Sequence, residues 1–102
     1  MRIIKRVTVE TYWKRHPQAE HALLFWHRMV KRARWTCIQD VRTMFPHADA
    51  VAVASGNSAV VFNIAGNKYR LITAIHYNAH KVFVLKFLTH AEYDKGKWKD
   101  VL

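Results

Sequence analysis

The sequence is short of the residues that mark several classes of protein. Its 102 residues include one cysteine, three glycines and two prolines. Because Cys37 stands alone, no intramolecular disulfide can form, and this favours the reducing cytosol as the compartment. The scarcity of glycine and proline argues against a loop-rich scaffold, while a hydrophobic content of 51% is enough to build a core.

Long apolar runs are also missing. No stretch approaches the roughly 20 apolar residues that span a bilayer, and residues 1–6 contain no apolar segment of the length that a signal peptide needs. We therefore expect a cytoplasmic protein without a membrane anchor.

Acidic residues are scarce, and this is the strongest compositional signal. Seven Asp and Glu face 17 Lys and Arg, for a formal net charge of +10. The excess is spread over both halves of the chain instead of being confined to a tail. A compact basic domain of this kind usually binds a polyanion. Charge alone leaves nucleic acid, an acidic protein and an anionic membrane surface open.

The first half of the chain has helical periodicity. Arg2–Ile4 is predicted to form a short strand, and Thr8 offers an N-cap for a helix over residues 9–15. Pro17 suits the first position of a second helix, which the apolar spacing extends over residues 18–33.

A third, shorter helix is predicted over residues 37–45. Thr36 and Gln39 have the spacing of a capping box at its start, and Pro46 ends it.

The apolar period changes to two after residue 50. Strands are predicted at residues 59–63, 68–77 and 81–89, joined by two-residue turns at Ala65-Gly66 and Asn78-Ala79. Residues 51–53 are left open as a strand or an extended lead-in. We expect one α+β domain over residues 1–102. Its small antiparallel sheet would hold the C-terminal meander and the N-terminal strand, with the N-terminal helices on one face.

Hairpin pairing divides the strand residues between two faces. With the predicted turns, Asn63 pairs with Lys68 and Arg70 with Phe87, and paired residues share a face. The apolar face that should meet the helices comprises Val60, Phe62, Ile64, Tyr69, Leu71, Ile75, Val82, Val84 and Leu88. The other face comprises Val61, Asn63, Lys68, Arg70, Ile72, Phe83, Leu85, Phe87 and Thr89. Lys86 does not fit, because it falls opposite Leu71; either it snorkels at an edge or one turn is a residue longer.

The polar residues favour acid–base chemistry without a metal. Seven histidines with a single cysteine and no C-x-x-C pair do not predict a closed zinc site, no glycine-rich phosphate loop is present, and no base is placed beside Cys37. His90 and Tyr93 instead follow the strand end that lies next to Lys68 and Arg70. RNA suits such a set, since its 2′-OH supplies the nucleophile and the protein needs only an acid, a base and cations.

Two stretches of the second half resemble a known family. They read Val61-Phe62-Asn63-Ile64-Ala65-Gly66-Asn67-Lys68-Tyr69-Arg70-Leu71-Ile72 and Thr89-His90-Ala91-Glu92-Tyr93-Asp94-Lys95, and a weaker match begins at His16-Pro17-Gln18-Ala19-Glu20. The chain resembles the HigB toxins, a branch of the RelE-like toxin superfamily of bacterial toxin–antitoxin systems. The resemblance covers nearly the whole chain.

The resemblance implies an mRNA interferase of RelE-like fold. Such toxins enter the decoding site of the ribosome, contact ribosomal RNA and cut the message, and a cognate helix-turn-helix antitoxin of the HigA kind neutralises them. It implies catalytic roles for Arg70, Lys68, His90 and Tyr93, with acid and base unassigned. Candidate RNA contacts are Asn63, Asn67, Lys95 and Trp98. No cofactor is expected.

Two alternatives remain open at this level. The chain could be a non-catalytic basic module that grips RNA or an acidic protein, with Trp98 in a polar C-terminal tail as the best residue to stack on a base. It could also be a toxin that has lost its activity and only binds its antitoxin.

Overall fold

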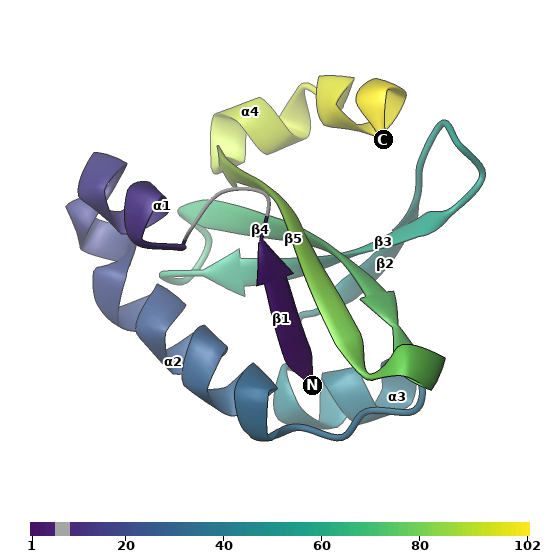
Figure 1. Cartoon of the computed structure of the whole chain (residues 1–102). Coiled ribbons are helices and arrows are strands. Elements are labelled where there is room, and N and C mark those ends of the chain that lie inside the picture. The colour runs from purple at the N-terminus through teal and green to yellow at the C-terminus, as the bar shows by residue number, and fades with distance from the viewer. Residues whose placement is uncertain (6–8) are drawn as a thin grey trace.

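The computed structural model describes residues 1–5 and 9–102, and Figure 1 shows the arrangement. Its helical elements are α1 (Val9–Arg15), η1 (Pro17–Ala19), α2 (Glu20–Arg32), α3 (Ile38–Met44), η2 (Tyr77–Ala79), α4 (His90–Asp94) and η3 (Lys97–Val101). Its strands are β1 (Arg2–Lys5), β2 (Asp49–Ala52), β3 (Ser58–Ile64), β4 (Tyr69–His76) and β5 (Lys81–Thr89). The predicted cap Thr8 lies outside the described residues. Within them, no helix is long and apolar enough to cross a membrane.

The strands form one five-stranded sheet in the order β1-β5-β4-β3-β2. The predicted α+β fold is confirmed, and the stretch that the sequence left open is strand β2 at one edge. The sheet is mixed, because β1 pairs with β5 in parallel, whereas the other pairs are antiparallel. The predicted sheet was antiparallel, and this difference arises because helices α1 to α3 lie between β1 and the meander along the chain.

Helices α1, α2 and α3 cover one face of the sheet, as Figure 1 shows and as the sequence predicted. Leu23, Trp26 and Val30 lie one helical turn apart on α2 and are fully buried. They meet an aromatic cluster in which Phe62 of β3 contacts Trp26, Trp35 and Phe45. The strongly basic residues of α2 remain on its solvent side.

The start of α3 differs from the prediction. The N-cap is Cys37, and its side chain makes no capping hydrogen bond. Thr36 instead donates to Asp40 from both its backbone nitrogen (2.9 Å) and its hydroxyl (2.8 Å). These bonds lower the pKa of the Asp40 carboxyl. The predicted capping box with Gln39 is therefore wrong, because a carboxylate one residue further on is the stronger acceptor.

The turn between β3 and β4 is two residues longer than predicted. Asn63 pairs with Arg70 and Ile64 with Tyr69, so the loop spans residues 65–68 instead of the Ala65-Gly66 pair alone. Ala65 (φ 55°) and Gly66 (φ 70°) both adopt the left-handed backbone conformation. A shift of two residues preserves the side-chain alternation, so the predicted faces of β3 remain correct.

A bulge in β5 corrects the predicted register of the second hairpin. Thr73 pairs with Val84 as expected, but Ile72 pairs with Lys86, so Leu85 is an extra residue on β5. The side chains beyond it exchange faces. Phe87 joins the helix-covered core and Leu88 the opposite face, the reverse of the prediction. Lys86 moves to that opposite face as well, which removes the conflict seen in the sequence.

The C-terminal segment is folded onto the second face of the sheet. Helices α4 and η3 cross this face in Figure 1. Trp98 of η3 is only 4% exposed and packs with Ala59, Val61 and Ile72 in a second small core. The expectation that Trp98 stands in an open polar tail is wrong, because the sheet offers apolar residues on both of its faces.

We expect Phe62→Ala to lower the free energy of unfolding by about 3–5 kcal/mol, since this ring is 1% exposed at the centre of the aromatic cluster. Phe25→Ala is the matched control, because Phe25 is 55% exposed, and it should cost less than about 1 kcal/mol. Urea denaturation of both variants measures the difference. Equal losses would contradict the assignment of the core.

Candidate active site

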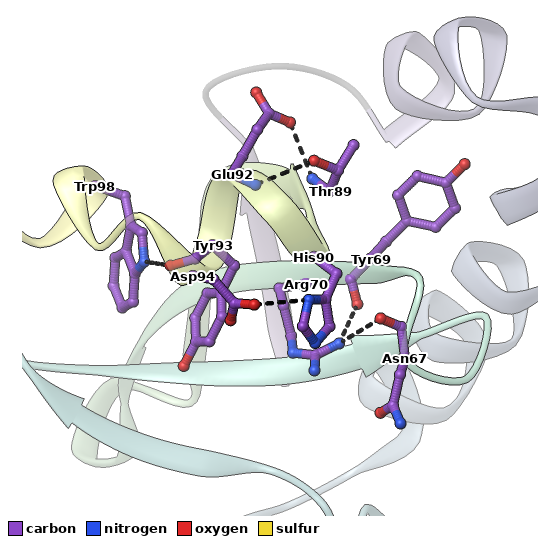
Figure 2. Close-up of polar contacts among 9 residues, drawn as sticks. All are labelled: Asn67, Tyr69, Arg70, Thr89, His90, Glu92, Tyr93, Asp94 and Trp98. Carbon is purple, nitrogen blue, oxygen red and sulfur yellow. Dashed lines mark hydrogen bonds and ion pairs between the residues drawn. The ribbon is translucent and has the colours of Figure 1, made fainter.

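The candidate site lies where the second face of the sheet meets α4. Arg70 of β4 stands between its pairing partners Asn63 on β3 and Leu88 on β5. Directly paired residues point to the same side, so all three side chains face α4. Residues from β3, β4, the 65–68 loop and α4 are thereby brought together. Figure 2 shows Arg70 of β4, Asn67 of the loop, and His90 and Tyr93 of α4.

The Arg70 guanidinium is half-buried and held in a fixed direction. Its Nη1 donates to the backbone carbonyls of Asn67 (3.2 Å) and Tyr69 (3.1 Å). The Cζ atom of Arg70 lies over the ring of Tyr93, 5.4 Å from its centroid, within the range of a cation–π contact. Among the described residues, no hydrogen bond takes up Nε or Nη2. These N–H donors remain available for an anion.

A capping box fixes the start of α4. The Glu92 backbone N–H donates to the Thr89 hydroxyl (3.2 Å), and the Thr89 N–H donates to Oε1 of Glu92 (3.0 Å). The sequence T-H-A-E has the spacing that this motif needs. Because Thr89 is also the last residue of β5, the cap sets the direction in which α4 leaves the sheet.

His90 occupies the first turn of α4. Its backbone N–H donates to the carbonyl of Lys68 (2.9 Å), which ties α4 to the loop that precedes Arg70. On its ring, Nδ1 lies 2.9 Å from Oδ2 of Asp94, one helical turn further on. Figure 2 shows the His90 ring on the same side of β4 as the Arg70 guanidinium. The carboxylate holds Nδ1 and so orients the imidazole, and Nε2 is the ring nitrogen that this contact leaves free.

Tyr93 is positioned by Trp98. The two rings stack with centroids 5.3 Å apart, and Nε1 of Trp98 donates to the Tyr93 carbonyl (3.2 Å). Burial, and to a smaller degree Asp49 and Asp94, raise the pKa of Tyr93, while Arg70 opposes them. Tyr93 therefore keeps its proton at neutral pH, and its hydroxyl can donate a hydrogen bond.

A shallow groove of about 360 Å³ runs beside the site. Three lysines line it: Lys86 of β5, with Lys95 and Lys97 from the end of α4 and the start of η3. Lys68 is exposed in the 65–68 loop, and Asn67 accepts a weak hydrogen bond from Asn63 (3.4 Å). Asn63 and Asn67 thus lie beside Arg70, whereas the groove does not reach Arg70 and is lined by Glu92 as well as by its three lysines.

Most of the residues singled out in the sequence meet here. Arg70, Tyr93 and His90 converge directly, Asn63 and Asn67 lie beside Arg70, and Lys68 and Lys95 lie at the rim. Trp98 is the exception, because its indole is buried beneath the site and is not free to stack on a base.

Two further residues were missed at the level of the sequence. Asp94 holds the His90 ring, and its spacing of four residues on a helix was a signal that could have revealed it. Lys86 lines the groove, but only the bulge in β5 places it there. Among the described residues, no group of three His, Cys, Asp or Glu side chains could hold a metal ion.

Comparison with known proteins agrees with this geometry. The model of the HigB toxin family, described as the RelE-like toxic component of a toxin–antitoxin system, matches residues 19–96. The chain belongs to this family. It is 30% identical over 95 residues to the mRNA interferase HigB of Escherichia coli O6:H1 strain CFT073, covering 93% of this chain and 90% of that protein.

More distant relatives share the same coverage. The mRNA interferase toxin HigB of Escherichia coli K12 and the mRNA interferase HigB of Shigella flexneri are each 21% identical over 94 residues. The match covers 92% of this chain and 88% of each relative. Both residues 63–70 and residues 90–93 lie inside the segment that the family model matches.

The capping box gives the protein a pH-dependent element of stability. Hydrogen bonds from the Thr89 N–H and hydroxyl lower the pKa of Glu92 below its usual 4.5. A lowered pKa stabilises the fold above the usual value, and the contribution is lost as the pH falls through the folded value. We expect the parent to exceed Glu92→Gln in unfolding free energy by about 0.3–1 kcal/mol at pH 7.

This difference should begin to shrink as the pH falls below the usual 4.5 and should close below the lowered pKa of the folded state, where the parent carboxyl is protonated. Thermal melting of both proteins from pH 3 to 7 measures it, and Gln is the matched control because it keeps an acceptor oxygen. A difference that stayed constant with pH would show that the Glu92 carboxylate is not engaged.

Proposed function

We propose that this toxin is a metal-independent endoribonuclease that cuts mRNA on the translating ribosome. The observation that carries the proposal is the convergence of the fixed Arg70 guanidinium, the protonated Tyr93 phenol and the His90–Asp94 pair on one open face. The cation is Arg70, the acid Tyr93 and the base His90. This scheme uses no nucleophile from the protein. RNA supplies that nucleophile as its 2′-OH.

Arg70 holds the scissile phosphate in this scheme. Its two backbone bonds aim the remaining N–H donors toward the open side of the sheet, where they can form a fork to two phosphate oxygens. The interaction is strongest when negative charge builds up on the phosphorus during attack. Lys68, which is exposed in the 65–68 loop, would add a second positive charge.

His90 and Tyr93 move the protons. With Nδ1 held by Asp94, Nε2 of the neutral imidazole takes the proton of the 2′-OH as its oxygen attacks phosphorus. The bond from the 2′-oxygen to phosphorus forms, and the bond from phosphorus to the 5′-oxygen breaks. Tyr93 gives its proton to that leaving oxygen. The products are a 2′,3′-cyclic phosphate and a 5′-OH end, and the cyclic end can open to a 3′-phosphate.

The neighbouring polar residues bind the rest of the message. Asn63 and Asn67 present amides that can orient the phosphate or a base, and Lys95 continues the positive groove along the RNA backbone. Trp98 serves as a positioning residue, since its indole stacks on Tyr93 and bonds its carbonyl.

The proposed setting is the bacterial cytoplasm. The relatives named mRNA interferase HigB support a message as substrate, and the basic surface suits the ribosomal RNA around the decoding site. Membership of a toxin–antitoxin family implies an antitoxin partner, which we propose to be a helix-turn-helix protein of the HigA kind. The reaction needs no cofactor, because its charges come from Arg70 and Lys68.

Arg70→Ala should reduce the rate of message cleavage about 10²–10³-fold and abolish growth arrest. Arg70→Lys should restore only part of the rate, since a point charge cannot replace the fork. Arg28→Ala is the matched control, because Arg28 is an exposed cation on the outer side of α2. Single-turnover cleavage of ribosome-bound message and induced growth arrest are the measurements.

Thermal melting accompanies these assays. Arg70→Ala should unfold with a loss of no more than about 1 kcal/mol, because its two hydrogen bonds lie near the surface. A folded Arg70→Ala protein that cuts at the parental rate would place the site elsewhere. A folded parent that neither cuts nor arrests growth would favour the non-catalytic binding module or an inactive toxin.

His90→Gln and Tyr93→Phe should each slow cleavage about 10²–10⁴-fold, the usual share of a general base or acid. Asp94→Asn should cause a smaller loss and change the pH profile of the rate, because it no longer orients a fixed imidazole tautomer. RNA affinity should stay near the parental value in all three. Parental rates in both His90→Gln and Tyr93→Phe would refute the assigned roles.

A further inference from the structure

A second basic site lies at the end of the sheet opposite α4. A pocket of about 800 Å³ opens where β1, the end of α2 and the turn before β5 meet. Five cationic side chains line it: Arg2, Lys5, Lys31, Arg32 and Arg34. No acidic side chain is among its lining residues. β5 connects the two sites: Lys81 at its start pairs with Arg2 in the wall of this pocket, and Thr89 at its end caps α4.

Backbone hydrogen bonds hold the walls of the pocket together. The Arg2 N–H donates to the carbonyl of His80 (2.7 Å), which joins β1 to the turn before β5. The nitrogen of Met1 donates to the carbonyls of Val30 (3.3 Å) and Ala33 at the end of α2. The cations therefore project from segments that are fixed relative to one another, and the charge cluster is part of the fold.

The positive charge of this pocket is not neutralised within the described chain. Burial, with further contributions from Lys5 and Lys31, lowers the pKa of His27 in its wall. Burial and the Arg34 guanidinium lower the pKa of the Met1 amino group. Burial is the larger cause of both pKa shifts, and the smaller contributions of Lys5, Lys31 and Arg34 come from cations close enough to repel a further positive charge.

We propose that this pocket binds the phosphate backbone of structured RNA, at a site separate from the candidate active site. Interfaces with nucleic acid are polar and strongly positive, whereas protein interfaces have an apolar core with aromatic anchors. The large exposed apolar side chains, Leu24, Phe25 and Val101, do not line this pocket. Arginines and lysines together suit phosphates, which they bind as forks and as point charges.

The inference does not depend on cleavage, because it concerns binding alone. The test uses a fluorescently labelled RNA duplex of about 12 base pairs, whose backbone is continuous, and follows its anisotropy with protein at several salt concentrations. The pocket variant is Lys31→Gln with Arg34→Gln. The matched control is Lys14→Gln with Arg15→Gln, which removes the same residue types from the exposed end of α1.

We expect the pocket variant to weaken duplex binding about tenfold or more near 0.1 M salt and to reduce the slope of log K against log salt by about 2. The control should change the affinity less than about threefold. The pocket variant should melt no lower than the parent, because it relieves repulsion between like charges.

Three results would overturn the inference. Equal losses in the pocket variant and the control would show diffuse attraction to net charge. A loss that followed Arg70→Ala instead would place duplex binding on the α4 side of the sheet and leave the proposed cleavage intact. Unchanged duplex binding combined with lost binding of a labelled peptide of glutamates would identify a protein-docking site.

Discussion

The bulge at Leu85 is the constraint on which the two faces of the molecule depend. Upstream of it, β5 supplies the helix-covered core with Val82 and Val84. Without the extra residue, Lys86 would face that core and Phe87 the opposite side. With it, Phe87 stacks on Tyr12 and Tyr69, and Lys86 joins the groove beside α4. The bulge therefore places Phe87 in the core. It also decides which side chains at the end of β5 face α4.

The elements were predictable where one physical signal dominated. Helix α2 follows from its apolar spacing, and β5 was predicted from residues 81 to 89 as observed. The register of the strands was less predictable. Val61 and Ile72 make the second face of the sheet apolar as well, so hydrophobic side chains are buried whichever face β5 turns toward the helices. A bulge has no residue signature of its own, and the misplaced Lys86 was its only trace in the sequence.

The candidate site was also predictable only in part from the sequence. Arg70, His90 and Tyr93 could be singled out because strand pairing and the family motif both bring them together. The contact between Asp94 and His90 and the burial of Trp98 could not be predicted in this way. Both depend on the angle at which α4 and η3 cross the sheet. The indole of Trp98, which we expected to stack on RNA, is packed against the ring of Tyr93 instead.

The few acidic residues have local structural tasks, which explains how the basic surface stays open. Asp94 orients His90, Glu92 caps α4, Asp40 binds Thr36, and Asp49 lies 3.7 Å from Arg42. None of these four lines the pocket at the far end of the sheet. The lining of that pocket therefore carries positive charge without a compensating carboxylate, as expected of a surface that binds a polyanion.

The central claim is that the RNA supplies the nucleophile while Arg70, His90 and Tyr93 serve the phosphate and the protons. The most direct measurement replaces the nucleotide on the 5′ side of the cut by its 2′-deoxy form in a ribosome-bound message. We expect this message to bind normally but not to be cut at that bond, and we expect the unmodified message to give 5′-OH ends. Cleavage of the deoxy message at the parental rate, or 5′-phosphate ends, would contradict it.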